Sequence, residues 1–93
     1  SNEKERLFMY ANERLQRNFT FYGLEALFNW FEQIEDETGE EIHFDPVSIC
    51  IDFADYKNFE EIKGDYPDLK DMEDLEDNTI VIPHEQGIII QKF

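Results

Sequence analysis

TIVIPHEQGIIIQKF, residues 79–93, is the stretch of sequence that decides the fold. Its two apolar runs, 79–82 and 88–93, are rich in the β-branched residues that favour strands, and the residues from Pro83 to Gly87 form a turn segment. This pattern predicts a β-hairpin. Because both runs carry apolar side chains at successive positions, apolar groups point to both faces, and we expect both faces of the sheet to be covered.

Two amphipathic helices are expected before this hairpin. The first is predicted over Asn2–Arg17, and the second over Tyr22–Thr38 with Thr20 as its N-cap and Gly39 just past its end. Their apolar residues recur at helical spacing, which indicates one buried face on each helix. These residues are Leu7, Phe8, Ala11 and Leu15 in the first helix and Leu24, Leu27, Phe28, Phe31 and Ile34 in the second.

The segment 41–53 reads as an extended strand that follows the two helices. Pro46 fits the start of a strand, since proline cannot donate a hydrogen bond within a ladder. Apolar and small polar residues alternate through the rest of the segment, so we expect the apolar set to face the helices. The apolar set is Val47, Ile49, Ile51 and Phe53, and the other is Ser48, Cys50 and Asp52.

Two short acidic helices are predicted between this strand and the hairpin. Asn58 caps the first, over Asn58–Asp65, and a further helical turn is expected from Leu69 to Leu75. The predicted fold class is therefore α+β. Two N-terminal helices pack on a three-stranded, mainly antiparallel sheet, with the short acidic helices between strands 1 and 2. With 93 residues, the chain is expected to form a single acidic domain, 1–93.

The charge of the chain is distributed unevenly. Residues 21–93 hold twenty acids against four lysines, a net charge of −16, whereas the first twenty residues carry +1. This charge disfavours direct binding to DNA, RNA or an anionic membrane, since those partners require clustered cations. A basic protein would be attracted instead. Solubility alone is the competing explanation of the acidity, and the sequence leaves both open.

Two stretches concentrate the acids: residues 32–45 hold seven acids and no base, and residues 52–77 hold eleven acids against three lysines. Helical spacing places carboxylates about 5–6 Å apart, so a folded acidic segment can imitate a phosphate backbone. A solvated face is the alternative explanation. Aromatic residues that lie among these acids in the sequence can contact the cationic side chains of a partner. The predicted partner-binding residues are Glu35, Asp36, Glu37, Glu40, Glu41, Asp55, Tyr56, Glu60, Glu61, Asp65, Tyr66, Asp68, Asp71, Glu73, Asp74, Glu76 and Asp77.

No pattern of catalytic or metal-ligating residues stands out. His43, Cys50 and His84 lack the spacing of a zinc site, and the two histidines are expected to be exposed beside strands. The acidic run 68–77 lacks the glycine and the alternation of a calcium loop. Asp52 is the one candidate for a general base, but a carboxylate that faces water from the open side of the sheet is the favoured explanation. We therefore expect no enzyme, no cofactor and no metal.

Cys50 is the only cysteine, and it is expected to be a small buried apolar group. A single cysteine forms no internal disulfide, which fits a reducing compartment. No apolar run approaches the roughly 18 residues of a membrane helix, and no secretion leader is visible. These features predict a cytoplasmic protein.

Four motifs carry a resemblance to a known group of proteins: Phe-Asp-Pro at 44–46, Tyr-x-Asn-Phe-Glu-Glu at 56–61, Leu-Glu-Asp-Asn-Thr at 75–79 and the ending Gly-Ile-Ile-Ile-Gln-Lys-Phe at 87–93. Over roughly residues 24–93, the chain resembles small acidic proteins of phages and mobile elements. The resemblance implies an accessory protein of a mobile element that acts in the host bacterial cell, and it carries no catalytic residues over.

The acidity and the resemblance together predict an inhibitor from a phage or mobile element. It would bind a basic, nucleic-acid-binding surface of a bacterial defence protein by DNA mimicry, in the manner of an anti-CRISPR or anti-restriction protein. The alternative is a charge-independent interaction module of a phage or plasmid, such as a homodimer formed through the sheet. A small enzyme using Asp52 or His43 is a third hypothesis.

Overall fold

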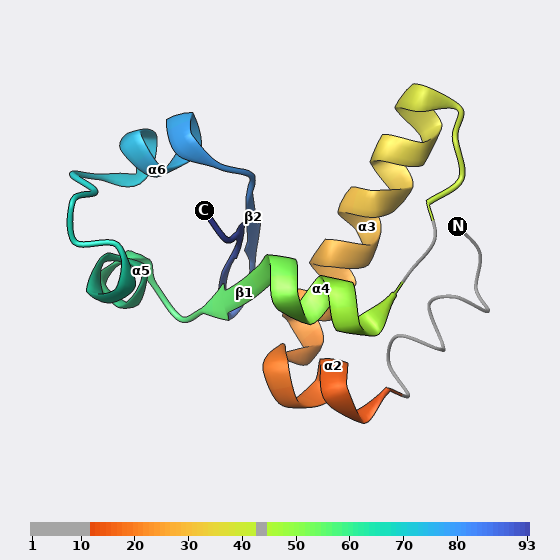
Figure 1. Ribbon diagram of the computed structural model, residues 1–93, viewed down its shortest axis with the longest axis horizontal. Coiled ribbons are helices and arrows are strands. Elements are labelled where there is room, and N and C mark those ends of the chain that lie inside the picture. Colours follow the sequence, from red (N-terminus) through yellow and green to blue (C-terminus); the bar gives the residue numbers. More distant parts are fainter. Residues whose placement is uncertain (1–11, 43–44) are drawn as a thin grey trace.

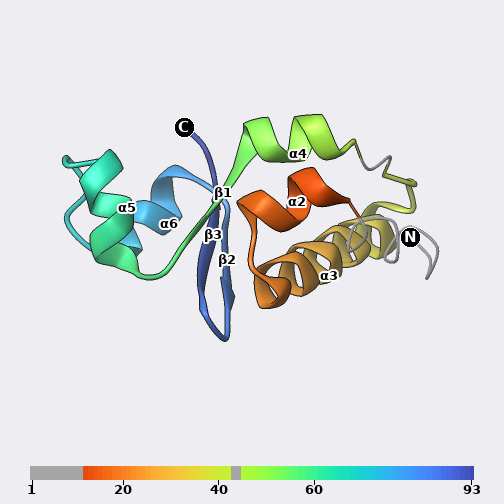
Figure 2. The same ribbon diagram turned by 90° about the horizontal axis from the view of Figure 1, so that it is seen from below.

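The computed structural model describes residues 12–42 and 45–93 as three layers, with a small β-sheet between two groups of helices. Figure 2 shows the sheet edge-on, with the helices α2, α3 and α4 on one side and α5 and α6 on the other. Figure 1 shows the same elements from another side, with the longest axis of the molecule horizontal. The helices are α2 (Glu13–Asn18), α3 (Phe21–Thr38), α4 (Pro46–Asp52), α5 (Phe59–Asp65) and α6 (Met72–Asn78).

The sheet has three antiparallel strands in the order β1-β3-β2, which confirms the predicted hairpin and antiparallel sheet. Strand β1 is Phe53–Tyr56, β2 is Val81–His84 and β3 is Gly87–Gln91. The hairpin turn is shorter than predicted, since only two residues separate β2 from β3. Pro83 lies on the edge strand β2, and edge strands are where proline is tolerated within a sheet.

Successive residues of β3 point to opposite faces of the sheet and contribute to two separate apolar cores. Ile89 packs with Phe53 and with the apolar face of α3, whereas Ile90 packs with Ile62 of α5 and Leu75 of α6. Both isoleucines are fully buried. The prediction that both faces of the sheet are covered is therefore confirmed, and the second cover is the pair of short acidic helices between β1 and β2.

Helices α3 and α5 begin and end almost where the sequence predicts. The Thr20 hydroxyl accepts a hydrogen bond from the N–H of Gly23, and Gly39 ends α3 in the left-handed conformation at φ 71°. Asn58 caps α5 in the same way. Helix α6 begins three residues later than predicted because Asp71 is its N-cap.

The predicted extended segment 41–53 is wrong, because Pro46–Asp52 forms helix α4. The Asp45 carboxylate accepts hydrogen bonds from the Val47 N–H and the Ser48 hydroxyl, each at 3.0 Å. Proline also suits the first position of a helix, where no N–H is needed. The expected burial holds for half of the apolar set: Ile49 and Phe53 are buried, whereas Val47 is 44% and Ile51 is 63% exposed.

The predicted first helix, Asn2–Arg17, lies mostly outside the described residues. Within them, Asn12 has an extended backbone and accepts hydrogen bonds from the N–H groups of Arg14 and Leu15. Asn12 is therefore an N-cap, and a helix running without interruption from Asn2 to Arg17 is wrong at that residue. Leu15 is fully buried, as its place in the apolar stripe predicts.

Two glycines lead to opposite predictions for substitution by alanine. A Cβ at Gly87 would collide with the backbone carbonyl of Tyr56, so we expect Gly87→Ala to destabilise the protein by about 2 kcal/mol or more. A Cβ at Gly64, inside α5, meets nothing within 4 Å, so Gly64→Ala is expected to stabilise by about 0.5–1 kcal/mol. Urea unfolding of both variants measures the difference, and equal stabilities would contradict the packing of β1 against β3.

Candidate functional site

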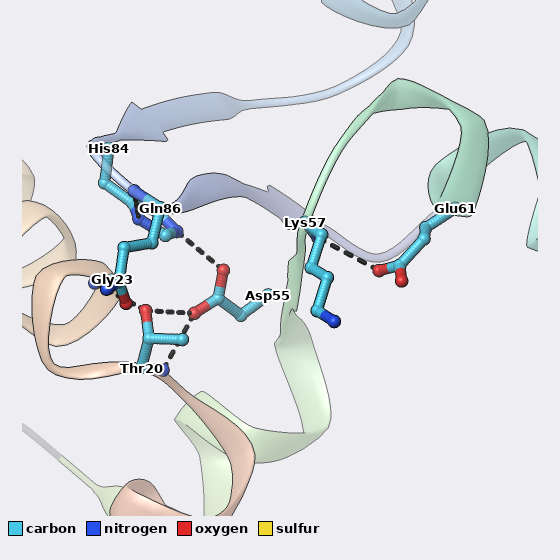
Figure 3. A network of polar contacts seen from close by, with 7 residues as sticks. All are labelled: Thr20, Gly23, Asp55, Lys57, Glu61, His84 and Gln86. Carbon is cyan, nitrogen blue, oxygen red and sulfur yellow. Dashed lines mark hydrogen bonds and ion pairs between the residues drawn. The ribbon is translucent and has the colours of Figure 1, made fainter.

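An enclosed polar cluster joins three segments that are distant in sequence, and we call it the Asp55 latch (Thr20, Asp55 and His84). Asp55 Oδ2 accepts hydrogen bonds from the N–H of Thr20 at 2.9 Å and from its hydroxyl at 3.0 Å (Figure 3). Asp55 Oδ1 lies 2.6 Å from His84 Nε2. The side chains of His84 and Asp55 are only 2% and 5% exposed. The latch connects the start of α3, strand β1 and the hairpin.

The backbone fixes which nitrogen of His84 carries the proton. The N–H of Gln86 donates to Nδ1 at 3.1 Å, so Nδ1 is an acceptor and Nε2 donates to Asp55. The Asp55 carboxylate also lies at the positive end of the α3 dipole. Gly23 leaves the room that this carboxylate occupies, because a Cβ there would collide with Asp55 Oδ2.

This arrangement differs from the sequence-based expectations for both His84 and Asp55. His84 was expected to be exposed, which is wrong because its ring is enclosed by Asp55 and the hairpin turn. Asp55, one of the predicted partner-binding acids, is engaged inside the fold. Alternation along β1 places Asp55 on the same face as the buried Phe53, but the predicted strand ended before Asp55 and hid this pattern.

Glu35 is a second predicted acid that turns inward. It is 7% exposed on the buried face of α3, and its Oε2 accepts a hydrogen bond from the Ile42 N–H at 2.8 Å. This contact holds the segment after α3 against the helix. Glu35 and Asp55 are therefore parts of the polar interior, and the exposed acids lie elsewhere.

The surface with the largest number of predicted partner-binding acids is the α5–α6 layer, defined here as residues 57–79. It contains nine acids and three lysines, a net charge of −6. Four of the predicted acids also stabilise the local fold. Glu61 accepts from the Lys57 N–H (Figure 3), Asp65 from the Tyr56 hydroxyl, Asp71 from the Asp74 N–H and Asp74 from the Lys70 N–H, over distances of 2.7–3.0 Å.

The other five predicted acids of the α5–α6 layer are exposed and make no hydrogen bond or ion pair with any residue in the described ranges. The three lysines of the layer also form no ion pair with its acids in those ranges. The layer therefore presents a net negative charge, and no ion pair within the described ranges neutralises its acids. The five acids are Glu60, Asp68, Glu73, Glu76 and Asp77.

The remaining predicted acids lie at the C-terminal end of α3 and just beyond it. Asp36, Glu37, Glu40 and Glu41 are all exposed, and Glu37 accepts one long hydrogen bond from Gln33 at 3.4 Å. Figures 1 and 2 place this end of α3 far from α5 and α6, on the opposite side of the sheet. The fold thus separates the two acidic stretches instead of joining them into one surface.

Tyr56 and Tyr66, the two aromatics predicted within the acids, are both half-buried. The Tyr56 hydroxyl donates to Asp65 at 2.7 Å, and the Tyr66 ring stacks on Phe93. Burial first, and then the bond to Asp65, raise the pKa of Tyr56 above its ordinary value. The phenol therefore stays neutral in the folded protein at a pH where it ionises in the unfolded chain.

This shift predicts a pH dependence of stability. Because the folded pKa of Tyr56 is raised, its contribution is complete below the ordinary tyrosine pKa of about 10 and is lost as the pH rises above that value. We expect the free energy of unfolding to fall more steeply above about pH 10 in the wild type than in Tyr56→Phe. Urea unfolding at several alkaline pH values measures both slopes, and parallel slopes would contradict the assignment.

The other residues singled out for chemistry do not assemble into a site within the described residues. Asp52 lies exposed at the end of α4, and His43 lies outside the described residues. Cys50 is half-buried against the core as a small apolar group, and burial raises the pKa of its thiol. In the described ranges, no group of three His, Cys, Asp or Glu side chains is placed to hold a metal ion.

Comparison of the chain with models of protein families, with curated proteins and with solved structures found no match. The resemblance to small acidic proteins of phages and mobile elements therefore stays a prediction. None of the described helices is both long enough and apolar enough to span a membrane.

Proposed function

We propose that this protein is an inhibitor that binds the basic, nucleic-acid-binding surface of a bacterial defence protein, in the manner of an anti-CRISPR or anti-restriction protein. The α5–α6 layer takes the place of the nucleic acid. The observation that carries the proposal is the set of five exposed acids in this layer, none of which is paired with a cation in the described part of the chain.

The physical basis is electrostatic complementarity between this layer and a surface built to bind phosphates. Clustered exposed charge accelerates association with an oppositely charged protein and fixes its orientation. The longest dimension of the molecule is 39 Å, a little more than one turn of duplex DNA at about 34–36 Å. The α5–α6 layer occupies one end of that axis (Figure 1). The surface that it would present to a partner is therefore shorter than one turn of duplex DNA.

Affinity capture tests the proposal. The immobilised protein is incubated with lysates of bacteria that carry restriction and CRISPR systems, at about 50 mM and about 200 mM salt. We expect a nucleic-acid-binding protein to be retained at the lower salt and largely lost at the higher, because screening weakens exposed charge pairs. Recovery of no nucleic-acid-binding protein at low salt would overturn the proposal.

A charge-independent interaction module is the second candidate function, and helix α4 favours it. Val47 and Ile51 lie one helical turn apart and expose apolar side chains, 44% and 63% respectively. Such a stripe suits a second copy of the chain or another apolar surface. Sedimentation of the wild type and of Ile51→Glu tests this candidate. A dimer that dissociates in the variant supports it, and a wild-type monomer at all concentrations rejects it.

A further inference from the structure

The end of α5, the loop that follows it, helix α6 and the segment after β3 line an open pocket of about 410 Å³. Its aromatic wall is formed by Tyr66 and Phe93, whose rings are stacked with centroids 4.3 Å apart and planes only 6° from parallel. The N–H of Phe93 donates to the Tyr66 hydroxyl at 3.3 Å, which fixes one ring against the other. Phe93 is nevertheless 51% exposed, so the aromatic wall is open to a ligand.

Three carboxylates of different availability line the same pocket. Asp65 uses Oδ2 for the Tyr56 hydroxyl, and Asp74 uses Oδ2 for the Lys70 N–H. Asp68 is exposed and makes no hydrogen bond or ion pair with the described residues. Both oxygens of Asp68 are therefore available to a donor that enters the pocket beside the aromatic wall.

We propose that this Tyr66–Phe93 pocket binds the guanidinium group of an arginine side chain presented by the partner protein. This inference rests on the proposed function and names the residue type that anchors the complex. The planar guanidinium stacks on an aromatic face while its N–H groups bond a carboxylate in bidentate fashion, which matches a pocket lined by both Phe93 and Asp68.

The charge and the aromatic wall of the pocket disfavour other kinds of occupant. An anion would be repelled by the three aspartates, and an apolar side chain would remove Asp68 from water without giving it a partner. A lysine ammonium satisfies the carboxylate, but it lacks the planar face that stacks on Phe93. The pocket therefore distinguishes arginine from lysine, whereas the general charge of the α5–α6 layer does not.

Binding of two short peptides tests this selectivity without the partner. Acetylated and amidated tri-arginine and tri-lysine have equal charge, and NMR shifts of the Tyr66 and Phe93 ring protons follow their binding. We expect tri-arginine to bind about fivefold more tightly, with ring-current shifts on its side-chain protons. Phe93→Leu, which keeps an apolar side chain but removes the aromatic face, should abolish this preference.

Matched aspartate variants separate the pocket from the surrounding charge. Asp68→Asn and Asp77→Asn remove the same charge from exposed residues, but only Asp68 lines the pocket. We expect Asp68→Asn to lower the arginine preference about threefold and Asp77→Asn to leave it unchanged. Equal binding of the two peptides to the wild type, or an unchanged preference in Phe93→Leu, would overturn the inference. These outcomes differ from failure of the proposed function, in which capture yields no nucleic-acid-binding protein.

Discussion

Asp55→Ala is expected to destabilise the protein by about 3–5 kcal/mol, one of the largest effects of a single substitution in this chain. The substitution removes three hydrogen bonds to a carboxylate that is 5% exposed. It also leaves His84 Nε2–H enclosed without an acceptor, which adds the cost of an unsatisfied buried donor. Urea unfolding, followed by the fluorescence of the single tryptophan Trp30, measures the change.

Asp52→Ala is the matched control, since it removes the same side chain three residues earlier, where the residue is exposed. We expect a change within about 0.5 kcal/mol, because Asp52 lies at the unfavourable end of the α4 dipole. A double-mutant cycle between Asp55→Ala and His84→Ala should show strong coupling. Additive effects, or equal losses at Asp52 and Asp55, would contradict the latch.

Neutralising four acids of the α5–α6 layer is expected to weaken partner binding about a hundredfold. The variant carries Glu60→Gln, Glu73→Gln, Glu76→Gln and Asp77→Asn, all at exposed residues with no hydrogen bond to the described residues. At about 0.7 kcal/mol for each exposed charge pair, the loss is close to 3 kcal/mol. Titration of the captured partner at fixed salt measures the affinity, and the fold should be unchanged.

The opposite acidic end of the molecule provides a control with the same change of charge. Asp36→Asn, Glu37→Gln, Glu40→Gln and Glu41→Gln remove four units of charge at the end of α3. We expect this variant to lose less than tenfold in affinity, since these residues lie away from the α5–α6 layer. Equal losses in the two variants would mean that total charge, rather than its position, determines binding. Full affinity in both would favour the charge-independent module.

Sequence reasoning succeeded where several local preferences agree. The isoleucines from Ile88 to Ile90 and the apolar runs on both sides of a turn segment favour a hairpin with both faces covered, and the structure has one. Helix α3 combines an N-cap, an apolar face and a glycine stop, so its predicted ends were correct to one residue. In these segments, patterning and capping indicate the same element.

The errors came from segments in which the preferences conflict. Val47, Ile49 and Ile51 alternate as in a strand, but Asp45 and Pro46 begin a helix, and the cap and proline outweighed the alternation. Because the first strand was predicted too early in the sequence, the inward position of Asp55 and the enclosure of His84 were not predicted. No sequence spacing connects Thr20, Asp55 and His84, so their contact follows only from the three-dimensional arrangement of α3, β1 and the hairpin.

The candidate surface was predicted in composition but not in shape. Sequence located the acids of residues 57–79, and the structure leaves five of them exposed and unpaired among the described residues. The inward turn of Glu35 and the separation of the two acidic ends depend on helix packing, which charge counts do not contain. The stacking of Tyr66 on Phe93 joins residues 27 positions apart and has no local pattern.

The most direct measurement of the proposed function is competition between this protein and nucleic acid for the captured partner. The partner is bound to labelled duplex DNA or guide RNA, and the protein is added at low salt. The account predicts mutually exclusive binding: release of the nucleic acid by the wild type, and about a hundredfold weaker release by the variant neutralised in the α5–α6 layer. A stable complex that contains the partner, the nucleic acid and this protein together would contradict it.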